Sequence, residues 1–343
     1  MDLFGDLPDP LESTSTGSST ISVESKNGKK RTSLDEALVE EKKIKFDEKR
    51  IDETKTYKKY KYKLKGCVSA QKGEREEMQD AHILLNDYTK HIPHLHPSIS
   101  RLALYCVFDG HGGSRASRFA SSQLHIVLRD TFPKGDVTNV EKEIRKTFIE
   151  TFKSLDEDFL HKASKNKPSW KDGTTAVSVL VINDTMYIAN LGDSKAILCR
   201  YNKTSGKYTA LPLTTDHSPS VYEERKRIQK AGGTVREGRV MGVLEVSRSL
   251  GDGPYKNHGV SCLPDIKRCQ LTDDDRYLMV ACDGLWKSFT MEESIKFVNN
   301  ILDTGEECNS AIQFETACTK LTSEAVLRLS GDNVTVILTS IKS

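Results

Sequence analysis

The chain has 343 residues, and its 51 Lys and Arg residues nearly balance its 49 Asp and Glu residues, which gives a formal net charge of +2. This balance lacks the basic excess that nucleic-acid binding calls for. Its eight cysteines form no C-x-x-C pair and no apolar run is long enough to span a bilayer, which argues against a zinc framework and a membrane protein. We therefore expect a reduced intracellular protein of one or two domains.

Residues 1–56 are rich in Ser, Thr, Glu and Lys and nearly lack aromatic side chains. We predict a disordered tail, because so little apolar surface cannot offset the entropy lost on ordering. Two basic clusters, at residues 26–31 and 42–45, are either nuclear-import signals or solvated charge. The first residues also lack the apolar core of a signal peptide, so the expected location is the cytoplasm, the nucleus or both.

The folded domain is predicted over residues 57–343. Residues 60–65 alternate aromatic or Leu side chains with Lys, which is typical of a half-buried strand, and a second strand is expected before residue 85. A loop with three histidines, residues 91–97, contains two prolines and is expected at the surface rather than at a metal. Residues 102–108 are all apolar or Cys and predict a buried strand.

Two helices and three strands are predicted next. Residues 114–132, with Ser114 as the candidate N-cap, predict a helix, and residues 140–163 predict a second one, whose apolar side chains recur at steps of three and four. Strands at residues 175–182, 186–190 and 195–200 are joined by short turns, so we expect an antiparallel meander.

The last part of the domain contains further short helices and strands. Residues 221–231 predict a charged helix that ends at a pair of glycines. Thr290 and Glu293 have the spacing of a capping box at the start of a helix. The remaining predictions are short strands at 234–246, strands at 277–282 and 334–341, and helices at 291–302 and 310–329.

Several aspartates stand at the ends of predicted strands, and the clearest are Asp109, Asp283 and Asp332. One Asp-Gly after a strand is an ordinary turn. Here a Gly-rich loop that contains His111 follows the first of them, and His is a general acid or base near neutral pH. If the strand ends meet, their carboxylates repel unless cations neutralise them. A pair of divalent ions would do so.

Eight segments, in order, resemble the motifs of the metal-dependent Ser/Thr protein phosphatases of type 2C. They are residues 75–82 (REEMQDAH), 107–113 (VFDGHGG), 172–176 (DGTTA), 192–194 (GDS), 231–233 (AGG), 246–252 (VSRSLGD), 281–284 (ACDG) and 331–333 (GDN). The resemblance implies an α+β fold, namely an antiparallel β-sandwich flanked by helices on both faces, with the site in a cleft at one end. Within the family, residues 73–80 and 222–233 resemble one branch most closely.

The resemblance also implies the roles of individual residues. Two Mg2+ or Mn2+ ions are expected, with a metal-bridging hydroxide that attacks phosphorus. The implied metal ligands are Asp109, the backbone carbonyl of Gly110, Asp283 and Asp332. The implied catalytic residues are Arg75, which grips phosphate, His111, which protonates the departing oxygen, and Asp80, which holds metal-bound water.

Two residues depart from the family pattern. Gln79 stands where a Glu is usual, so one water-ordering carboxylate is lost. Lys287 stands where many members have an Asp that serves a weak third metal, which Asp193 and Asp283 would otherwise bind. Lys287 would repel that ion and is instead a candidate for contacting phosphate or substrate.

Arg248 resembles the arginine beside the family's cleft and is a candidate substrate-binding residue, while residues 216–260 resemble its flap. The expected partners are phosphoprotein substrates, with a kinase or its complex left open. We expect a monomer that binds neither nucleic acid nor membrane. Two other functions remain alternatives at this point, namely a catalytically poor scaffold for a kinase or regulator and a metal-dependent phosphodiesterase or nuclease.

Overall fold

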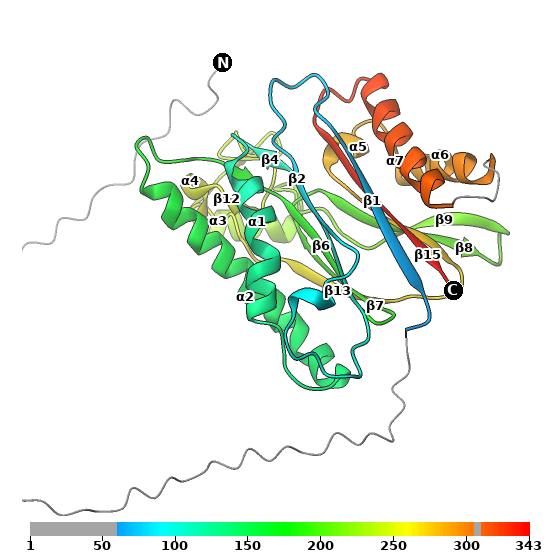
Figure 1. The fold of residues 1–343 in the computed structure, drawn as a ribbon. Helices are drawn as coiled ribbons and strands as arrows, with labels where there is room; N and C mark the ends of the chain where they lie inside the picture. The colour runs from blue at the N-terminus through cyan, green and yellow to red at the C-terminus, as the bar shows by residue number, and fades with distance from the viewer. Residues whose placement is uncertain (1–59, 305–309) are drawn as a thin grey trace, which may run out of the picture. The chain divides into compact units, whose positions relative to one another are not determined.

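Two five-stranded antiparallel sheets pack face to face in the computed structural model, which describes residues 60–304 and 310–343 (Figure 1). The first sheet, in spatial order, contains β1 (Lys63–Gln71), β15 (Val334–Lys342), β14 (Asp275–Ala281), β8 (Lys195–Asn202) and β9 (Lys207–Pro212). The second contains β13 (Asp265–Gln270), β7 (Thr185–Leu191), β6 (Ala176–Ile182), β3 (Leu102–Phe108) and β2 (Ala81–Leu85). The predicted tail of residues 1–56 lies outside the described residues.

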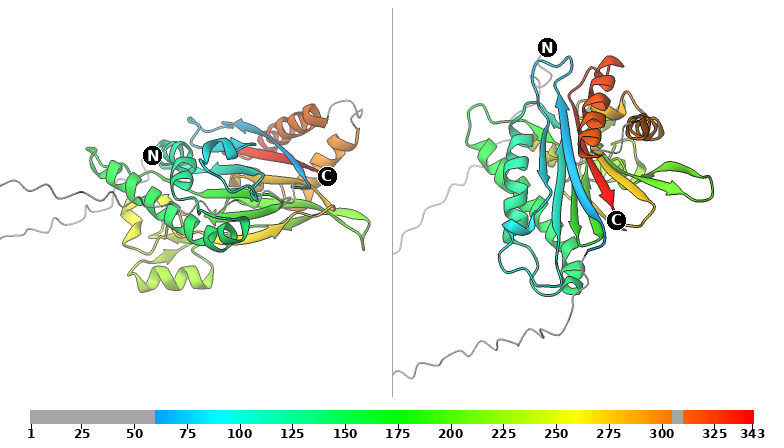
Figure 2. Two further views of the ribbon diagram at one scale, coloured as in Figure 1. Left: turned by 60° about the horizontal axis from the view of Figure 1, so that its bottom comes forward. Right: turned by 45° about the vertical axis from the view of Figure 1, so that its right-hand side comes forward.

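A pair of helices covers the outer face of each sheet (Figure 2). Helices α1 (Arg115–Asp130) and α2 (Val137–Ser164) share an apolar core with the second sheet. Helices α6 (Met291–Thr304) and α7 (Ser310–Leu327) share another with the first sheet. The predicted sandwich with helices on both faces is confirmed.

The composition of β3 shows why its predicted strand is apolar throughout. Leu102, Leu104 and Phe108 face the helices, while Ala103 and Tyr105 face the other sheet. Because both faces of this strand are covered, polar residues have no solvent to face and the usual alternation is lost. All seven residues of β3 are buried.

The predicted meander is wrong for its third strand. Strands β6 and β7 pair as expected, but β8 pairs with β14 and β9 in the other sheet. The connecting residues Gly192, Asp193 and Ser194 therefore cross from one sheet to the other, with Gly192 at a φ of 102°. A short turn fits a hairpin and a sheet crossing equally well, so local sequence does not distinguish them. The crossing places Asp193 between the two sheets.

Smaller elements complete the domain near the sheet ends. A three-stranded sheet contains β12 (Leu250–Gly251), β5 (Gly173–Thr174) and β4 (Gly110–His111), in that order. The segment 216–260 contains α3 (Tyr222–Lys230), β10 (Val235–Arg236), β11 (Arg239–Val240) and α4 (Gly253–Lys256). Two single-turn helices are η1 (Thr89–His91) and α5 (Asp283–Trp286). Among the described residues, we find no helix with the length and apolar character to cross a membrane.

Candidate active site

Strand ends from both sheets bring acidic side chains together. Asp109 follows β3, Asp283 follows β14, and Asp80 precedes β2. Ligand atoms of Asp80, Asp109 and the Cys282 thiol lie within 4.8 Å of one another. The backbone N–H of Asp283 donates to Oδ2 of Asp109 at 3.4 Å. The structure thus unites carboxylates that are up to 203 positions apart in the sequence.

Burial and neighbouring negative charges raise the pKa values of three aspartates at these strand ends. Burial, followed by the charges of neighbouring aspartates, raises the pKa of Asp109 well above its usual range. Burial is also the largest cause for Asp80, whose pKa rises to about 6, and for Asp193, whose pKa rises to about 7. Burial raises the pKa of the Cys282 thiol as well, so that group stays protonated and is no nucleophile at neutral pH.

The ligand atoms of this cluster are of the kind that bind divalent cations. Oδ2 of Asp80 accepts a hydrogen bond from Thr335 at 2.7 Å, but its buried Oδ1 has no partner among the described residues. A buried acceptor without a partner is costly unless an unseen group satisfies it. Carboxylate oxygens are the ligands that Mg2+ and Mn2+ prefer. The donor set and its shared negative charge therefore suit such ions.

Lys287 joins two of the predicted metal ligands. Its Nζ lies 2.7 Å from Oδ2 of Asp283 and 2.7 Å from Oδ2 of Asp332. Arg75 adds a second cation, with Nε 3.0 Å from Oδ1 of Asp332. Burial raises the pKa of Asp332, but the bonds from Lys287 and Arg75 and the Asn333 backbone N–H outweigh it, so the pKa falls below its usual range. The sequence interpretation missed this bridge, although Asp283 and Lys287 have the i,i+4 spacing of helical ion pairs.

We predict that Lys287→Met binds Mn2+ more tightly than the wild type. The substitution removes a fixed positive charge from two carboxylates, and 1 to 2 kcal/mol of relieved repulsion corresponds to an affinity gain of about tenfold. Isothermal titration calorimetry measures it, with Lys296→Met on the exposed face of α6 as the matched control. Unchanged or weaker binding in Lys287→Met would show that the bridge does not oppose the metal.

Asn333 anchors the loop that carries Arg75. Its Oδ1 accepts from the backbone N–H of Gln79 at 2.8 Å, and its Nδ2 donates to the carbonyls of Lys72 and Glu77 at 2.7 and 3.0 Å. The sequence interpretation did not assign Asn333 a role. The backbone of Gln79 is held on both sides, because its N–H donates to Asn333 and its carbonyl accepts a hydrogen bond from Ser117.

Gly110 must be a glycine for the Gln79 carbonyl to lie where it does. A Cβ on Gly110 would lie 2.2 Å from that carbonyl oxygen and 2.8 Å from Oγ of Ser117. Such approaches are far inside van der Waals contact, so a side chain here would displace the strand end. The close packing fixes the backbone on which the predicted carbonyl ligand of Gly110 lies.

His111 lies beside this cluster and contacts a buried acid. Its Nε2 is 2.7 Å from Oδ2 of Asp252, and its side chain is 28% exposed. Burial lowers the pKa of His111, but the charge and hydrogen bond of Asp252 outweigh it and raise the pKa above its usual value. The sequence analysis included Asp252 in a motif without giving it a role.

The turn after His111 is held by Asp172 rather than by the predicted cap. Ser114 occupies the N-cap position of α1, but its side chain makes no capping bond. Oδ2 of Asp172 accepts instead from the backbone N–H of Arg115 at 3.1 Å and from its Nε at 2.8 Å. A Cβ on Gly113 would lie 2.3 Å from the same Oδ2, so the lack of a side chain at this position leaves room for the carboxylate beside the turn.

Comparison with known proteins decides the family. The family model described as protein phosphatase 2C matches residues 64–334. The chain belongs to the protein phosphatase 2C family. It is a metal-dependent protein serine/threonine phosphatase.

The most similar relatives include two named integrin-linked kinase-associated serine/threonine phosphatase 2C. The Homo sapiens protein is 50% identical over 370 residues, which cover 99% of this chain and 93% of the relative. The Rattus norvegicus protein is 55% identical over 284 residues, which cover 81% and 72%. They belong to the branch that residues 73–80 and 222–233 indicated.

Solved structures share the fold of this chain. A C. elegans sex-determining protein matches with a TM-score of 0.67 and 26% identity, over 81% of this chain and 64% of that one. A serine-threonine phosphatase 2C from Toxoplasma gondii matches with a TM-score of 0.65 and 19% identity, over 83% and 96%. The second likeness concerns the fold alone.

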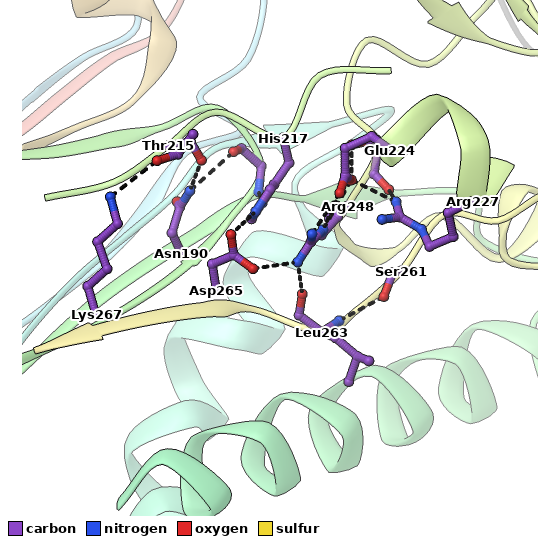
Figure 3. A network of polar contacts seen from close by, with 12 residues as sticks. Asn190, Thr215, His217, Glu224, Arg227, Arg248, Ser261, Leu263, Asp265 and Lys267 are labelled. Carbon is purple, nitrogen blue, oxygen red and sulfur yellow. Dashed lines mark hydrogen bonds and ion pairs between the residues drawn. The ribbon is translucent and has the colours of Figure 1, made fainter. Parts of the chain in front are cut away.

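Arg248 of this phosphatase 2C domain is already engaged in a polar network (Figure 3). Its guanidinium lies 2.6 Å from Oε1 of Glu224 and 2.9 Å from Oδ1 of Asp265, and it donates to the carbonyl of Leu263 at 3.0 Å. Its side chain is 17% exposed. The predicted role in substrate binding would require these bonds to be released, so the geometry favours a role in anchoring α3.

Glu224 is the centre of that network. It also accepts from Ser247 at 2.5 Å and pairs with Arg227 at 2.8 Å. Burial raises the pKa of Glu224, but the hydrogen bonds from Arg248, Arg227 and Ser247 outweigh it and lower the pKa to about 2. A single buried carboxylate thus ties α3 to residues 247 and 248.

We predict that Glu224→Gln lowers the free energy of unfolding by about 3 kcal/mol, because breaking a buried ion pair leaves its cations without a counter-charge. Urea denaturation measures this change. Glu223→Gln is the matched control, since the neighbouring residue on the same helix is exposed. Equal stability of the two variants would contradict the anchoring role.

Proposed function

We propose that this phosphatase hydrolyses phosphoserine and phosphothreonine in proteins with two Mg2+ or Mn2+ ions. The carboxylates of Asp109, Asp283 and Asp332 and the carbonyl of Gly110 would hold them. The observation that carries the proposal is the convergence of carboxylates from both sheets, where burial and then neighbouring charges raise the pKa values of Asp80 and Asp109, and where Oδ1 of Asp80 has no partner among the described residues. When bound, such ions supply Lewis acidity, which lowers the pKa of water and offsets negative charge on phosphate.

Three side chains of this chain serve the substrate and water. The guanidinium of Arg75 is 57% exposed, so it can turn from Asp332 to grip two phosphate oxygens. Asp80 accepts a hydrogen bond from water and orients it for attack on phosphorus. His111 protonates the departing Ser or Thr oxygen, an alkoxide that is a poor leaving group without a proton.

The test of this function is the release of phosphate from a phosphothreonine peptide by the full chain. We expect turnover with Mn2+ or Mg2+ and loss of turnover when a chelator is added. Calorimetry with Mn2+ measures binding directly, and we expect it in the micromolar to millimolar range. Robust turnover in chelator would contradict the metal dependence of this site.

Asp193 is the candidate ligand for a weak third ion, which Lys287 is expected to exclude. After burial, the negative charge of Asp283 is the next largest cause of the raised pKa of Asp193, which supports the closeness of these two carboxylates. The bond from Lys287 to Asp283 opposes this ion, as the sequence analysis expected of a lysine at that position.

The partner and the location are also proposals. The name of the relatives supports a kinase, or a complex that contains one, as a partner and supports a role in signalling regulation. The two basic clusters of the tail support nuclear import alongside a cytoplasmic pool, and a monomer is expected. If import depends on the tail, deletion of residues 1–52 shifts the protein to the cytoplasm, which microscopy of a tagged chain measures.

A further inference from the structure

The small sheet aligns His111 with a buried acid that is 141 residues away in the sequence. His111 pairs with Gly173 across β4 and β5, and Gly173 pairs with Gly251 across β5 and β12. Asp252 follows Gly251 directly. Its carboxylate therefore crosses the central strand to reach the imidazole, at 2.7 Å from Nε2.

The residue between them has no side chain, and this permits the contact. A Cβ on Gly173 would lie 2.1 Å from Oδ2 of Asp252 and 2.4 Å from Nε2 of His111. Any other residue at this position would fill the space in which the imidazole and the carboxylate meet. The central strand is thus shaped around this pair of side chains.

The Asp252 carboxylate is buried and is held through Oδ2, while its Oδ1 has no hydrogen-bond partner among the described residues. The side chain is only 1% exposed. Its backbone N–H donates to the carbonyl of Asp172 at 2.9 Å, and Oγ of Ser249 donates to Oδ2 at 2.5 Å. Its backbone is left-handed, with φ 53° and ψ 44°, a conformation that a non-glycine residue keeps only where its surroundings impose it.

The two ring nitrogens of His111 are therefore in different environments. Nε2 faces the carboxylate, whereas Nδ1 has no hydrogen-bond partner in residues 60–304 and 310–343. The ring lies two residues beyond Asp109 and remains partly exposed. A hydrogen bond at one ring nitrogen sets the orientation of the ring and which nitrogen is left for the substrate.

We propose that Asp252, assisted by Ser249, is a positioning residue that presents Nδ1 of His111 to the departing oxygen of the substrate. The proposal rests on the proposed role of His111 as general acid. In that step the P–O bond breaks, its electron pair stays on the Ser or Thr oxygen, and the proton on Nδ1 passes to that oxygen. Water adds its oxygen to phosphorus and releases one proton to solvent, and solvent returns a proton to the imidazole.

Two substrates separate positioning from general structural support. The leaving group of a phosphothreonine peptide is an alkoxide, which needs a proton. The leaving group of 4-nitrophenyl phosphate is 4-nitrophenolate, which is stable without one. Loss of the positioned acid therefore lowers kcat for the peptide alone. We expect Asp252→Ala to lower that kcat at least about tenfold, within the range that general acids contribute, with KM and aryl phosphate turnover within about threefold of wild type.

Asp252→Asn keeps the shape and one acceptor for Nε2–H, so we expect it to recover part of the peptide activity and to fold where Ala does not. The matched control is Asp156→Asn. This second buried aspartate accepts from the backbone N–H of Gly251 at 2.8 Å and supports the same strand, but no bond joins it to His111. We expect it to lower stability without changing the ratio of the two activities.

A double-mutant cycle with His111→Gln completes the test. If Asp252 acts through His111, Asp252→Asn has little further effect on peptide turnover in the His111→Gln background. Equal losses on both substrates, a full additional loss in that background, or unchanged peptide kcat would each overturn the proposal. Wild-type phosphate release with Mn2+ tests the proposed function separately, so failure of one is distinguishable from failure of the other.

Discussion

Asp109→Ala is expected to lower kcat for a phosphothreonine peptide by a factor of about 1,000 or more. Asp109 lies at the middle of the carboxylate cluster, where Asp80, Asp193, Asp283 and Asp332 all act on its charge. Removing a carboxylate that would hold the two ions lowers transition-state stabilisation by several kcal/mol, and each 1.4 kcal/mol is a factor of about ten in rate. Steady-state kinetics with saturating Mn2+ measure the loss.

The same variant should be more stable than the wild type when metal is absent. The buried charge of Asp109 is unfavourable beside its neighbours, so replacing it with a neutral side chain removes repulsion. Thermal unfolding in chelator is expected to show a higher Tm for Asp109→Ala, while added Mn2+ should stabilise only the wild type. Opposite effects on stability and activity are the signature of a functional acidic cluster rather than a structural one.

Asp130→Ala is the control, because this aspartate lies on the exposed end of α1 with its side chain 58% exposed. We expect it to leave both activity and metal-dependent stabilisation unchanged. Retention of Mn2+-dependent turnover in Asp109→Ala would remove the basis for the proposed site.

Stabilisation by metal is expected to grow with pH between about pH 5 and 7.5. Asp80 and Asp193 have folded-state pKa values of about 6 and about 7, raised from 3.8 mainly by burial. Well below pH 3.8 both groups are protonated whether the chain is folded or not. As pH rises through the folded pKa values, the folded chain must bear charges that the unfolded chain bears easily, so the metal-free protein loses stability.

Bound cations reverse this loss, because metal ligands bind in their deprotonated form. The rise in the pKa of Asp80 alone corresponds to about 3 kcal/mol, and 1 kcal/mol shifts Tm by about 2 to 4 °C for a domain of 150–250 residues. The difference in Tm between Mn2+ and chelator should therefore increase by several degrees from pH 5 to pH 7.5.

Subtracting the Tm in chelator from the Tm in Mn2+ at each pH cancels the contributions of titrating groups outside the cluster. Glu224, with its pKa lowered to about 2, stabilises the fold above pH 4.5 both in Mn2+ and in chelator. Burial lowers the pKa values of His82 and His217, and their effect on stability is likewise the same in both conditions. In Asp109→Ala the difference should be small at every pH. A metal effect that stays constant from pH 5 to pH 7.5 in the wild type would show that these carboxylates do not titrate with metal binding.

Much of the architecture follows from local pattern. The apolar run before Asp109 predicted β3, the stripe along residues 140–163 predicted α2, and the spacing of Thr290 and Glu293 predicted the start of α6. Each of these signals involves residues within a few turns of one another, so periodicity and capping chemistry reveal them without knowledge of the rest of the chain.

The candidate site was predicted in part for the same reason. Aspartates at the ends of apolar strands are visible one segment at a time, and the ordered motifs added the expected roles of Arg75 and His111. The sequence did not predict correctly how all of these strand ends meet. The connection to β8 was predicted as an ordinary hairpin, but it crosses to the other sheet and places Asp193 between the sheets.

The sequence by itself determined which segments become strands and helices and which carboxylates stand at their ends, because these depend on neighbouring residues. Only the tertiary structure decided that Lys287 bridges Asp283 and Asp332, that Asn333 anchors the Arg75 loop and that Asp252 reaches His111. Such contacts depend on packing between segments far apart in the chain, and hydrogen bonds and charges act over a few ångströms in space regardless of separation in sequence.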